Sequence, residues 1–400
     1  MNIFVINSGS SSIKYQLFKM PATQPVCSGL VERIGLDNAT ITHKIYKDGD
    51  EQVIKKTQDI DDHDQGLMLV NKLLTDIMTG VVQDTDEIAV IGHRIVHGGE
   101  AFTTTTVITP DVKEKLKSTF QLAPLHNPPA YLGITVAEKI FTKATQIAVF
   151  DTAFHQTIPA MAYRFAIPEK YYTDLNIRTY GFHGTSHKYV TEQASSYLNK
   201  PDAKLISIHL GNGCSMAAVN AGKCVDTSMG FGPLSGLIMG TRSGDIDATV
   251  VFYLVNQLGY DIGQVSNILN KNSGMLGLTG YSDMRDITAA INEGNEAAKL
   301  AYDMYAYRIK KYIGAYAAAL NGLDAIIFTA GVGENDSLVR EMVCRDMEYL
   351  GIKIDIDKNT IRQPGIRNIS GKSSAVQVLI VPTNEELEIA NQCMALLDAV

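Results

Sequence analysis

The sequence lacks the features that would place the protein in a membrane or in an oxidising compartment. No apolar run in its 400 residues reaches the ~18 that a membrane-spanning helix needs. The first residues enter a predicted strand without the basic start of a signal peptide. Five scattered cysteines with no CxxC pair favour free thiols and argue against a zinc site. We therefore expect a cytoplasmic protein.

A basic surface is missing as well. The chain has 35 Lys and Arg against 43 Asp and Glu, a net charge of −8, so nucleic acid is not expected as a partner. An anionic substrate must then be met by local cations, which makes isolated arginines near glycine-rich turns informative. The length predicts two domains, and no low-complexity segment or short-period repeat is present.

Two strand–turn–strand segments carry small residues in the turn. Strands predicted at 3–7 and 13–18 flank Ser8–Ser12, and strands predicted at 205–210 and 216–219 flank residues 211–215. Glycine and serine let the backbone approach a ligand, and their N–H and hydroxyl groups can surround phosphate oxygens. Either segment alone could be a plain hairpin, but the pair predicts a duplicated nucleotide-binding unit that holds phosphates from both sides of a cleft.

Strand and helix patterns alternate through the rest of the chain, which predicts α/β architecture. We expect buried strands at 88–91, 146–150, 325–328 and 376–381, and helices at 66–81 and 296–320. Ligands in such folds bind at the carboxyl ends of strands. Small residues with a polar or charged neighbour stand at these ends, namely Asn7–Lys14, His209–Gly213, Gly331–Asn335, Thr383–Glu385 and Asp151.

Three isolated side chains are candidates for contact with a transferred phosphoryl group or a carboxylate. Arg94 follows a predicted strand, and Arg242 lies between Gly240 and Gly244. A rigid arginine fork is costly unless it meets a carboxylate or phosphate, with surface solvation as the alternative. His183 precedes a helix that we expect Thr185 or Ser186 to cap, and it is a candidate donor to a phosphoryl group.

Two other features favour structural roles. His93 and His97 have i, i+4 spacing, but no third ligand is near and the segment is not predicted to be helical, so polar packing is favoured over a metal site. Cys214 lies in the second turn, where we interpret it as a small loop residue and not as a nucleophile.

Eight motifs together resemble the acetate kinase family, in order and from residue 3 to about residue 390. They are Asn7-Ser-Gly-Ser-Ser-Ser-Ile-Lys14, Gly92-His-Arg-Ile-Val-His-Gly-Gly99, Pro124-Leu-His-Asn-Pro128, Phe150-Asp-Thr-Ala-Phe-His155, His183-Gly-Thr-Ser-His187, His209-Leu-Gly-Asn-Gly213, Met239-Gly-Thr-Arg-Ser-Gly-Asp245 and Pro382-Thr-Asn-Glu-Glu386. The resemblance implies a duplicated actin-like (ribonuclease H-like) ATPase fold with two lobes around a nucleotide cleft. Residues 1–150 plus 385–400 would form the lobe for acetate, phosphate and Mg²⁺, and residues 151–384 the nucleotide lobe.

The resemblance also implies a role for each matching residue. Asn7 and Glu385 would lie near Mg²⁺, for which Mn²⁺ could substitute, and Arg94, Asp151, His183 and Arg242 would be catalytic. The acyl pocket would comprise Arg94, Val96, Leu125, Phe182 and Pro233. ATP or ADP would contact Lys14, His209, Leu210, Gly211, Asn212, Gly213, Asp283, Met284, Arg285, Gly331, Val332, Gly333, Glu334 and Asn335. A homodimer is expected.

The implied reaction is reversible Mg²⁺-dependent phosphoryl transfer from ATP to acetate. A carboxylic acid with a pKa near ~4 is already ionised at neutral pH, so Asp151 is better interpreted as an organiser than as a base. We expect direct in-line transfer, with a phosphorylated Glu385 as the rival. The chain has Phe231-Gly-Pro-Leu-Ser-Gly236 where the family usually has Leu-Thr-Pro-Leu-Glu-Gly, and Ala330 and Cys214 are milder departures.

Two alternatives stay open. The first is a propionate kinase. Similar enzymes that act on propionate have Ala where this chain has Val96, and the larger Val96 side chain would shorten the acyl pocket here. An actin- or Hsp70-like ATP switch is the alternative from another class. Such proteins lack the pair of arginines that faces the γ-phosphate.

Overall fold

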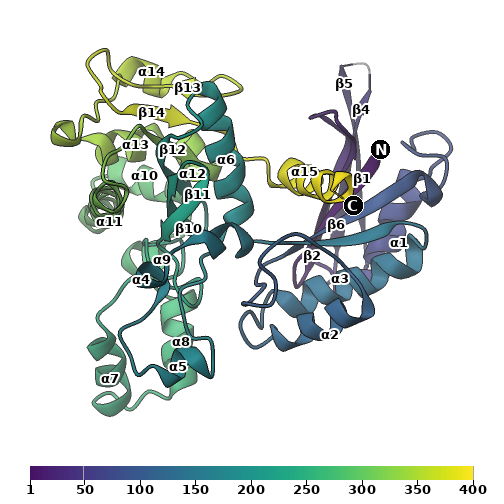
Figure 1. Ribbon diagram of the computed structural model, residues 1–400, viewed down its shortest axis with the longest axis horizontal. Helices are drawn as coiled ribbons and strands as arrows, with labels where there is room; N and C mark the ends of the chain where they lie inside the picture. The colour runs from purple at the N-terminus through teal and green to yellow at the C-terminus, as the bar shows by residue number, and fades with distance from the viewer. Residues whose placement is uncertain (48, 400) are drawn as a thin grey trace. The chain divides into compact units, whose positions relative to one another are not determined.

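The computed structural model describes residues 1–47 and 49–399, and the chain divides into two compact units (Figure 1). Met1–Phe154 and Asn384–Val400 form the first unit, and His155–Thr383 forms the second. These boundaries lie a few residues from those expected at 150 and 385. Asp151, which pairs with Arg94, belongs to the first unit.

The first unit is built on an eight-stranded sheet of order β5-β4-β3-β2-β1-β6-β8-β7. Its strands are β1 (Asn2–Ser8), β2 (Ser12–Lys19), β3 (Pro25–Glu32), β4 (Ala39–Lys47), β5 (Asp50–Gln58), β6 (Ile88–Ile95), β7 (Thr106–Val107) and β8 (Thr145–Phe150). Its helices of more than four residues are α1 (His63–Leu74), α2 (Pro110–Ser118), α3 (Asn127–Ile140) and α15 (Glu385–Asp398). Phe4, Ile6 and Tyr15 are fully buried in the core beneath α1 and α3.

The second unit has a six-stranded sheet of order β11-β10-β9-β12-β14-β13. Its strands are β9 (Lys204–Leu210), β10 (Cys214–Asn220), β11 (Lys223–Thr227), β12 (Ala325–Thr329), β13 (Arg367–Asn368) and β14 (Gln377–Ile380). Its helices are α4 (Ala160–Tyr163), α5 (Lys170–Thr173), α6 (Gly184–Tyr197), α7 (Ala248–Asn256), α8 (Ile262–Lys271), α9 (Gly274–Thr279), α10 (Met284–Asn292), α11 (Glu296–Leu320), α12 (Ala330–Asn335), α13 (Ser337–Cys344) and α14 (Ile356–Thr360).

The two sheets share a five-strand pattern. In the first, β3-β2-β1 are antiparallel neighbours, and β6 and β8 then follow parallel to β1. In the second, β11-β10-β9 and then β12 and β14 repeat that order and those directions. The predicted duplication is confirmed.

Two helices belong to one unit although the last sheet strand before them in the sequence belongs to the other unit. Helix α6 follows β8 of the first sheet but packs on β9 and β12, and α15 follows β14 of the second sheet but packs on β1, β6, β2 and β8 (Figure 1). Gly92 on β6 permits this contact, because a Cβ there would lie 2.8 Å from Ile389 of α15. The first turn of α6 therefore contacts the β9–β10 hairpin, and the first turn of α15 contacts the β1–β2 hairpin.

One predicted element differs from the structure. The helix expected over 66–81 spans only His63–Leu74, and Ile77, expected on its apolar face, is 99% exposed. The Asp76 carboxylate accepts the backbone N–H groups of Met78 and Thr79, a local turn that ends the helix. Gly331–Asn335, predicted only as small and polar residues at the end of a strand, belong to the short helix α12. Within the described residues, no helix is long and apolar enough to cross a membrane.

Candidate active site

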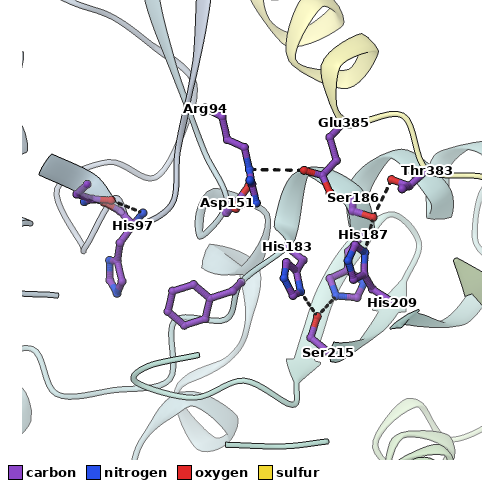
Figure 2. A network of polar contacts seen from close by, with 12 residues as sticks. Arg94, His97, Asp151, His183, Ser186, His187, His209, Ser215, Thr383 and Glu385 are labelled. Carbon is purple, nitrogen blue, oxygen red and sulfur yellow. Dashed lines mark hydrogen bonds and ion pairs between the residues drawn. The ribbon is translucent and has the colours of Figure 1, made fainter. Parts of the chain in front are cut away.

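Arg94 and Asp151 meet in the first unit because β6 and β8 are adjacent parallel strands. Arg94 lies on β6 and Asp151 directly follows β8, where its N–H still bonds to Ile95. The Arg94 Nε and Nη2 groups donate to the two Asp151 carboxylate oxygens at 3.2 and 2.6 Å (Figure 2). Asp151 is 1% exposed. The contact is the two-point fork that fixes a guanidinium most firmly.

Glu385, the first residue of α15, is the second carboxylate beside Arg94. Its Oε2 lies 3.5 Å from Arg94 Nε. Burial opposes the guanidinium charge, but Asp151 and Glu385 raise the pKa of Arg94 above its usual value. Burial raises the pKa of Glu385, with Arg94 opposing the rise and Asp151 reinforcing it. The cluster is thus a buried cation between two carboxylates.

Lys14 extends this cluster along the first hairpin. It pairs with Asn7 across β1 and β2, and its Nζ lies 2.6 Å from Glu386 Oε1. Within the described residues, no three His, Cys, Asp or Glu side chains are grouped to hold a metal alone. Mg²⁺ commonly takes one or two carboxylates and completes its shell with water and phosphate oxygens. Glu385 lies near Asp151, and Asn7 lies opposite Lys14 on the hairpin, so these side chains offer oxygen donors of that kind.

His183 lies in a polar cluster of the second unit, between α6 and the sheet. It occupies the N-cap of α6 in the left-handed region, with φ 56°, and its side chain makes no capping bond. The cap expected from Thr185 or Ser186 is therefore wrong, since the helix begins one residue after His183. Instead, His183 Nδ1 lies 2.9 Å from Ser215 Oγ, and its ring stacks on His209 at 4.3 Å between centroids (Figure 2).

Arg242 lies beside His183. A Cβ on Gly213 would stand 3.3 Å from His183 Nε2 and 3.8 Å from Arg242 Nη1, so glycine keeps this space open. Arg242 Nη1 donates to the Pro233 carbonyl at 2.9 Å. Burial lowers the pKa of Arg242, and no carboxylate is among the causes of the shift. Unlike Arg94, it is oriented by a neutral group.

A cavity of about 850 Å³ opens in the second unit. Among the predicted nucleotide residues, its lining includes Gly211, Asn212, Asp283, Met284, Arg285, Gly331, Val332 and Asn335. The Arg285 guanidinium donates hydrogen bonds to the Asp283 carboxylate and lowers the pKa of that carboxyl to about 2. His209, Leu210, Gly213, Gly333 and Glu334 were predicted with them but do not line the cavity.

Beside the cavity, the Glu334 side chain connects the segments that follow β12 and β14. Its Oε1 accepts the N–H groups of Ala330 and Thr383 at 3.0 and 3.1 Å. Ala330, which follows β12, has φ 65°, a conformation in which an alanine side chain is crowded. The helical turn that presents Gly331 and Val332 to the cavity is therefore held partly under strain.

The remaining predicted residues have varied environments. Val96 and Leu125 lie in the first unit, and Leu125 is 67% exposed; Phe182 and Pro233 lie in the second. The acyl pocket that needs all four stays a prediction. Buried His93 bonds to Gln146 at 2.8 Å, as polar packing predicts. Burial raises the pKa of Cys214 to about 11, which disfavours a nucleophilic thiolate.

Comparisons with known proteins identify the family. The model of the acetokinase family matches residues 2–391. The chain belongs to the acetokinase family. An acetate kinase of Flavobacterium johnsoniae is 57% identical over 398 residues, which cover all of both chains. Among solved structures, the Porphyromonas gingivalis acetate kinase has a TM-score of 0.92 at 43% identity over 99% of each chain. A propionate kinase from Francisella tularensis has a TM-score of 0.91 at 40% identity over 98% of each chain.

Several residues of this family member escaped the prediction. Glu386 binds Lys14 while Glu385 faces Arg94, and the doubled Glu after Pro382-Thr-Asn could have pointed to both. Tyr305, Asp336 and Arg362 line the cavity. They come from α11, the start of α13 and the segment after α14. No local motif marks them.

Proposed function

We propose that this kinase transfers the γ-phosphoryl group of ATP to acetate, giving acetyl phosphate and ADP, and that it catalyses the reverse reaction. The full-length likeness to an acetate kinase carries the proposal. That match spans both the Arg94 cluster and the cavity. Substrate recognition then divides between the units, with the carboxylate assigned to the first and the nucleotide to the second.

Acetate needs no general base, since its carboxyl group is ionised at neutral pH. The contact of Arg94 with both Asp151 oxygens supports a positioning role for Asp151. We assign Arg94 to the substrate carboxylate. We assign His183 and Arg242 to the transferring phosphoryl group, where cationic and N–H donors stabilise the charge of the transition state.

Direct in-line transfer is the proposed route. The rival, phosphorylation of Glu385, is disfavoured because this carboxylate is already paired with Arg94. Incubation with γ-labelled ATP in the absence of acetate distinguishes the two routes. Label that stays on Glu385 after denaturation would support the rival.

The nucleotide is assigned to the cavity of about 850 Å³, whose size suits a small-molecule ligand. Gly331 and Val332 would contact it from α12, Asn212 from the second hairpin and Asp283–Arg285 from the start of α10. His209, Leu210, Gly213, Gly333 and Glu334 would shape the strand ends behind these residues. Lys14 is assigned to the phosphates, although in the structure it is paired with Glu386.

Mg²⁺, with Mn²⁺ as a possible substitute, is the proposed metal, held by Glu385 and Asn7 with Asp151 nearby. When bound, it would neutralise phosphate charge and so reduce repulsion between two anionic substrates. Arg94 and Lys14 supply part of the same neutralisation from the chain itself.

We also propose a cytoplasmic homodimer. All five cysteines are free and buried, as expected in a reducing compartment. Helix α7, the turn after it and the start of α8 expose the large apolar side chains of Val250, Phe252, Tyr253, Leu258, Tyr260 and Ile262. Patches of this kind commonly mark interfaces. Light scattering of the wild type and of Phe252→Glu tests the assignment, with a monomeric wild type contradicting it.

One assay tests the activity. ATP-dependent hydroxamate formation with acetate, propionate and butyrate, side by side, should show acetate as the preferred acceptor. The propionate alternative rests on the likeness to the Francisella enzyme, and a preference for propionate would establish it. ATP hydrolysis without any acyl phosphate would favour the switch-like alternative.

A further inference from the structure

A chain of four side chains leads from the sheet of the second unit to His183. His187 Nδ1 lies 2.8 Å from Ser207 Oγ, and His187 Nε2 lies 2.8 Å from Ser215 Oγ. Ser215 Oγ in turn lies 2.9 Å from His183 Nδ1 (Figure 2). Ser207, His187 and Ser215 have no exposed surface.

Strand alternation brings these groups to one face. Ser207 and His209 are two residues apart on β9, and Ser215 pairs with His209 across β10, so all three side chains point toward α6. The opposite face of the hairpin meets α11, where Cys214 contacts Tyr305. The polar chain is thus a built part of the interface between the sheet and α6.

His187 is held neutral. Burial lowers its pKa well below the usual value, and His155 and His209 lower it further. The rings of His155 and His209 both lie beside that of His187. A neutral imidazole has one N–H and one acceptor nitrogen, and a serine has one O–H donor. In the described residues the Ser215 side chain bonds only to His183 and His187, so its O–H must donate to one of these two rings and accept from the other. The hydrogen bonds of the chain therefore all run in one direction.

Two directions are possible, and the serine at the far end distinguishes them. If Ser207 donates to His187 Nδ1, then His187 Nε2–H donates to Ser215, and Ser215 O–H donates to His183 Nδ1. Every hydrogen then has an acceptor. In the opposite direction the Ser207 O–H would need another acceptor, and in residues 1–47 and 49–399 its side chain bonds to His187 alone. An unsatisfied buried hydroxyl is unfavourable.

We infer that Ser215 is a positioning residue, which donates to His183 Nδ1 and thereby keeps the His183 proton on Nε2. This inference rests on the proposed function for its catalytic meaning. The Nε2 edge faces the space beside Gly213 and Arg242. A neutral His183 with its proton on Nε2 can donate to a phosphoryl oxygen there without any change in protonation.

Nitrogen NMR of the histidine-labelled wild type at pH 7.5 tests the inference without a variant. His183 and His187 should both carry the proton on Nε2. His183 found with the proton on Nδ1, or as an imidazolium, would overturn the inference even in an active kinase. An inactive protein with the expected tautomers would instead count against the proposed function.

Kinetics of Ser215→Ala give the second readout. We expect kcat to fall roughly tenfold, the smaller end of the effects of losing hydrogen-bonded catalytic geometry, with both KM values within about twofold. Ser215→Thr, which retains the hydroxyl, should recover most of kcat. Ser228→Ala is the matched control, because Ser228 is a buried hydroxyl of the same region whose side chain, among the residues that the structure describes, bonds only to the Met216 N–H. Equal losses of kcat in Ser215→Ala and Ser228→Ala would assign Ser215 a merely structural role.

Discussion

The two units share a strand order but place different chemistry at the same positions. The β1–β2 hairpin of the first unit corresponds to the β9–β10 hairpin of the second. In the next-to-last residue pair before the turn, Asn7 is opposite Lys14 in the first hairpin, and His209 is opposite Ser215 in the second. Lys14 then meets Glu386 in the first turn of α15, whereas Ser215 meets His187 in the first turn of α6. The first unit thus secures its helix with opposite charges, and the second does so with a neutral imidazole and hydroxyl.

The two candidate arginines repeat this contrast. Arg94 is held by two carboxylates, and Arg242 by the Pro233 carbonyl. The shared fold fixes where a side chain can lie, but the local sequence decides whether it is oriented by charge. A charged cluster must lose stability when one partner is removed, whereas a neutral contact loses little.

Alanine at either arginine should have the largest effect. Arg94→Ala and Arg242→Ala should each lower kcat/KM about 10²-fold or more, as for lost charge-assisted contacts to a transition state. Near-normal turnover in either soluble variant would remove that arginine from the mechanism. Lysine at each position is the matched control, which retains charge but lacks the planar fork.

The same two variants separate the units by stability. Arg94→Ala leaves the Asp151 and Glu385 carboxylates without their cation, so its free energy of unfolding should fall by about 3 kcal/mol. Arg242→Ala should lower it by only about 1–1.5 kcal/mol, because it removes a hydrogen bond to the Pro233 carbonyl. Urea denaturation measures both. A more damaging Arg242→Ala would reverse the proposed contrast.

Acyl selectivity should depend on Val96 of the first unit. Val96 follows β6 and is partly buried, and acetate should exceed propionate roughly tenfold in kcat/KM, about the value of one methylene in a closed pocket. Val96→Ala should reduce that ratio. Leu338→Ala, in the cavity of the second unit, should instead raise the KM for ATP. A ratio altered equally by both variants would place acyl selectivity elsewhere.

Much of this contrast could be predicted from the sequence. Two strand–turn–strand patterns sufficed for the duplicated sheets. Arg94 and Asp151 were each predicted from their places after buried strands, whereas the adjacency of those strands is seen only in the structure. Lys14 and the cavity-lining glycines were found for the same reason, since strand ends are visible as changes in local pattern.

The rest depends on contacts that local pattern does not contain. The Ser207–His187–Ser215 chain exists because α6 packs on a sheet whose strands come later in the sequence. Arg362 reaches the cavity from a segment after α14. The end of α1 depends on competition between Asp76 side-chain bonds and helix propagation, a balance that apolar spacing does not report.

Salt should affect the two hairpin contacts differently. Lys14 is 51% exposed in its pair with Glu386, so Lys14→Met should cost no more than about 1 kcal/mol of unfolding free energy, and less as salt screens the pair. The decrease in the free energy of unfolding caused by Ser215→Ala should be the same at low and high salt. Denaturation at two salt concentrations measures this, and an equal salt response in both variants would contradict the charge assignment of the first unit.

Ala330→Gly should have the smallest effect and concerns the second unit alone. Ala330 has φ 65° at the end of β12, where glycine avoids the cost of about 1–2 kcal/mol that a Cβ adds. Glycine also gains about 0.4–1 kcal/mol of entropy in the unfolded chain. The net result should be a stabilisation of up to about 1.6 kcal/mol, seen as a higher midpoint in urea. Ala289→Gly, at an exposed position of helix α10, is the matched control and should destabilise by about 1 kcal/mol. If both variants lower the urea midpoint, the backbone conformation of Ala330 does not destabilise the protein, and the prediction is wrong.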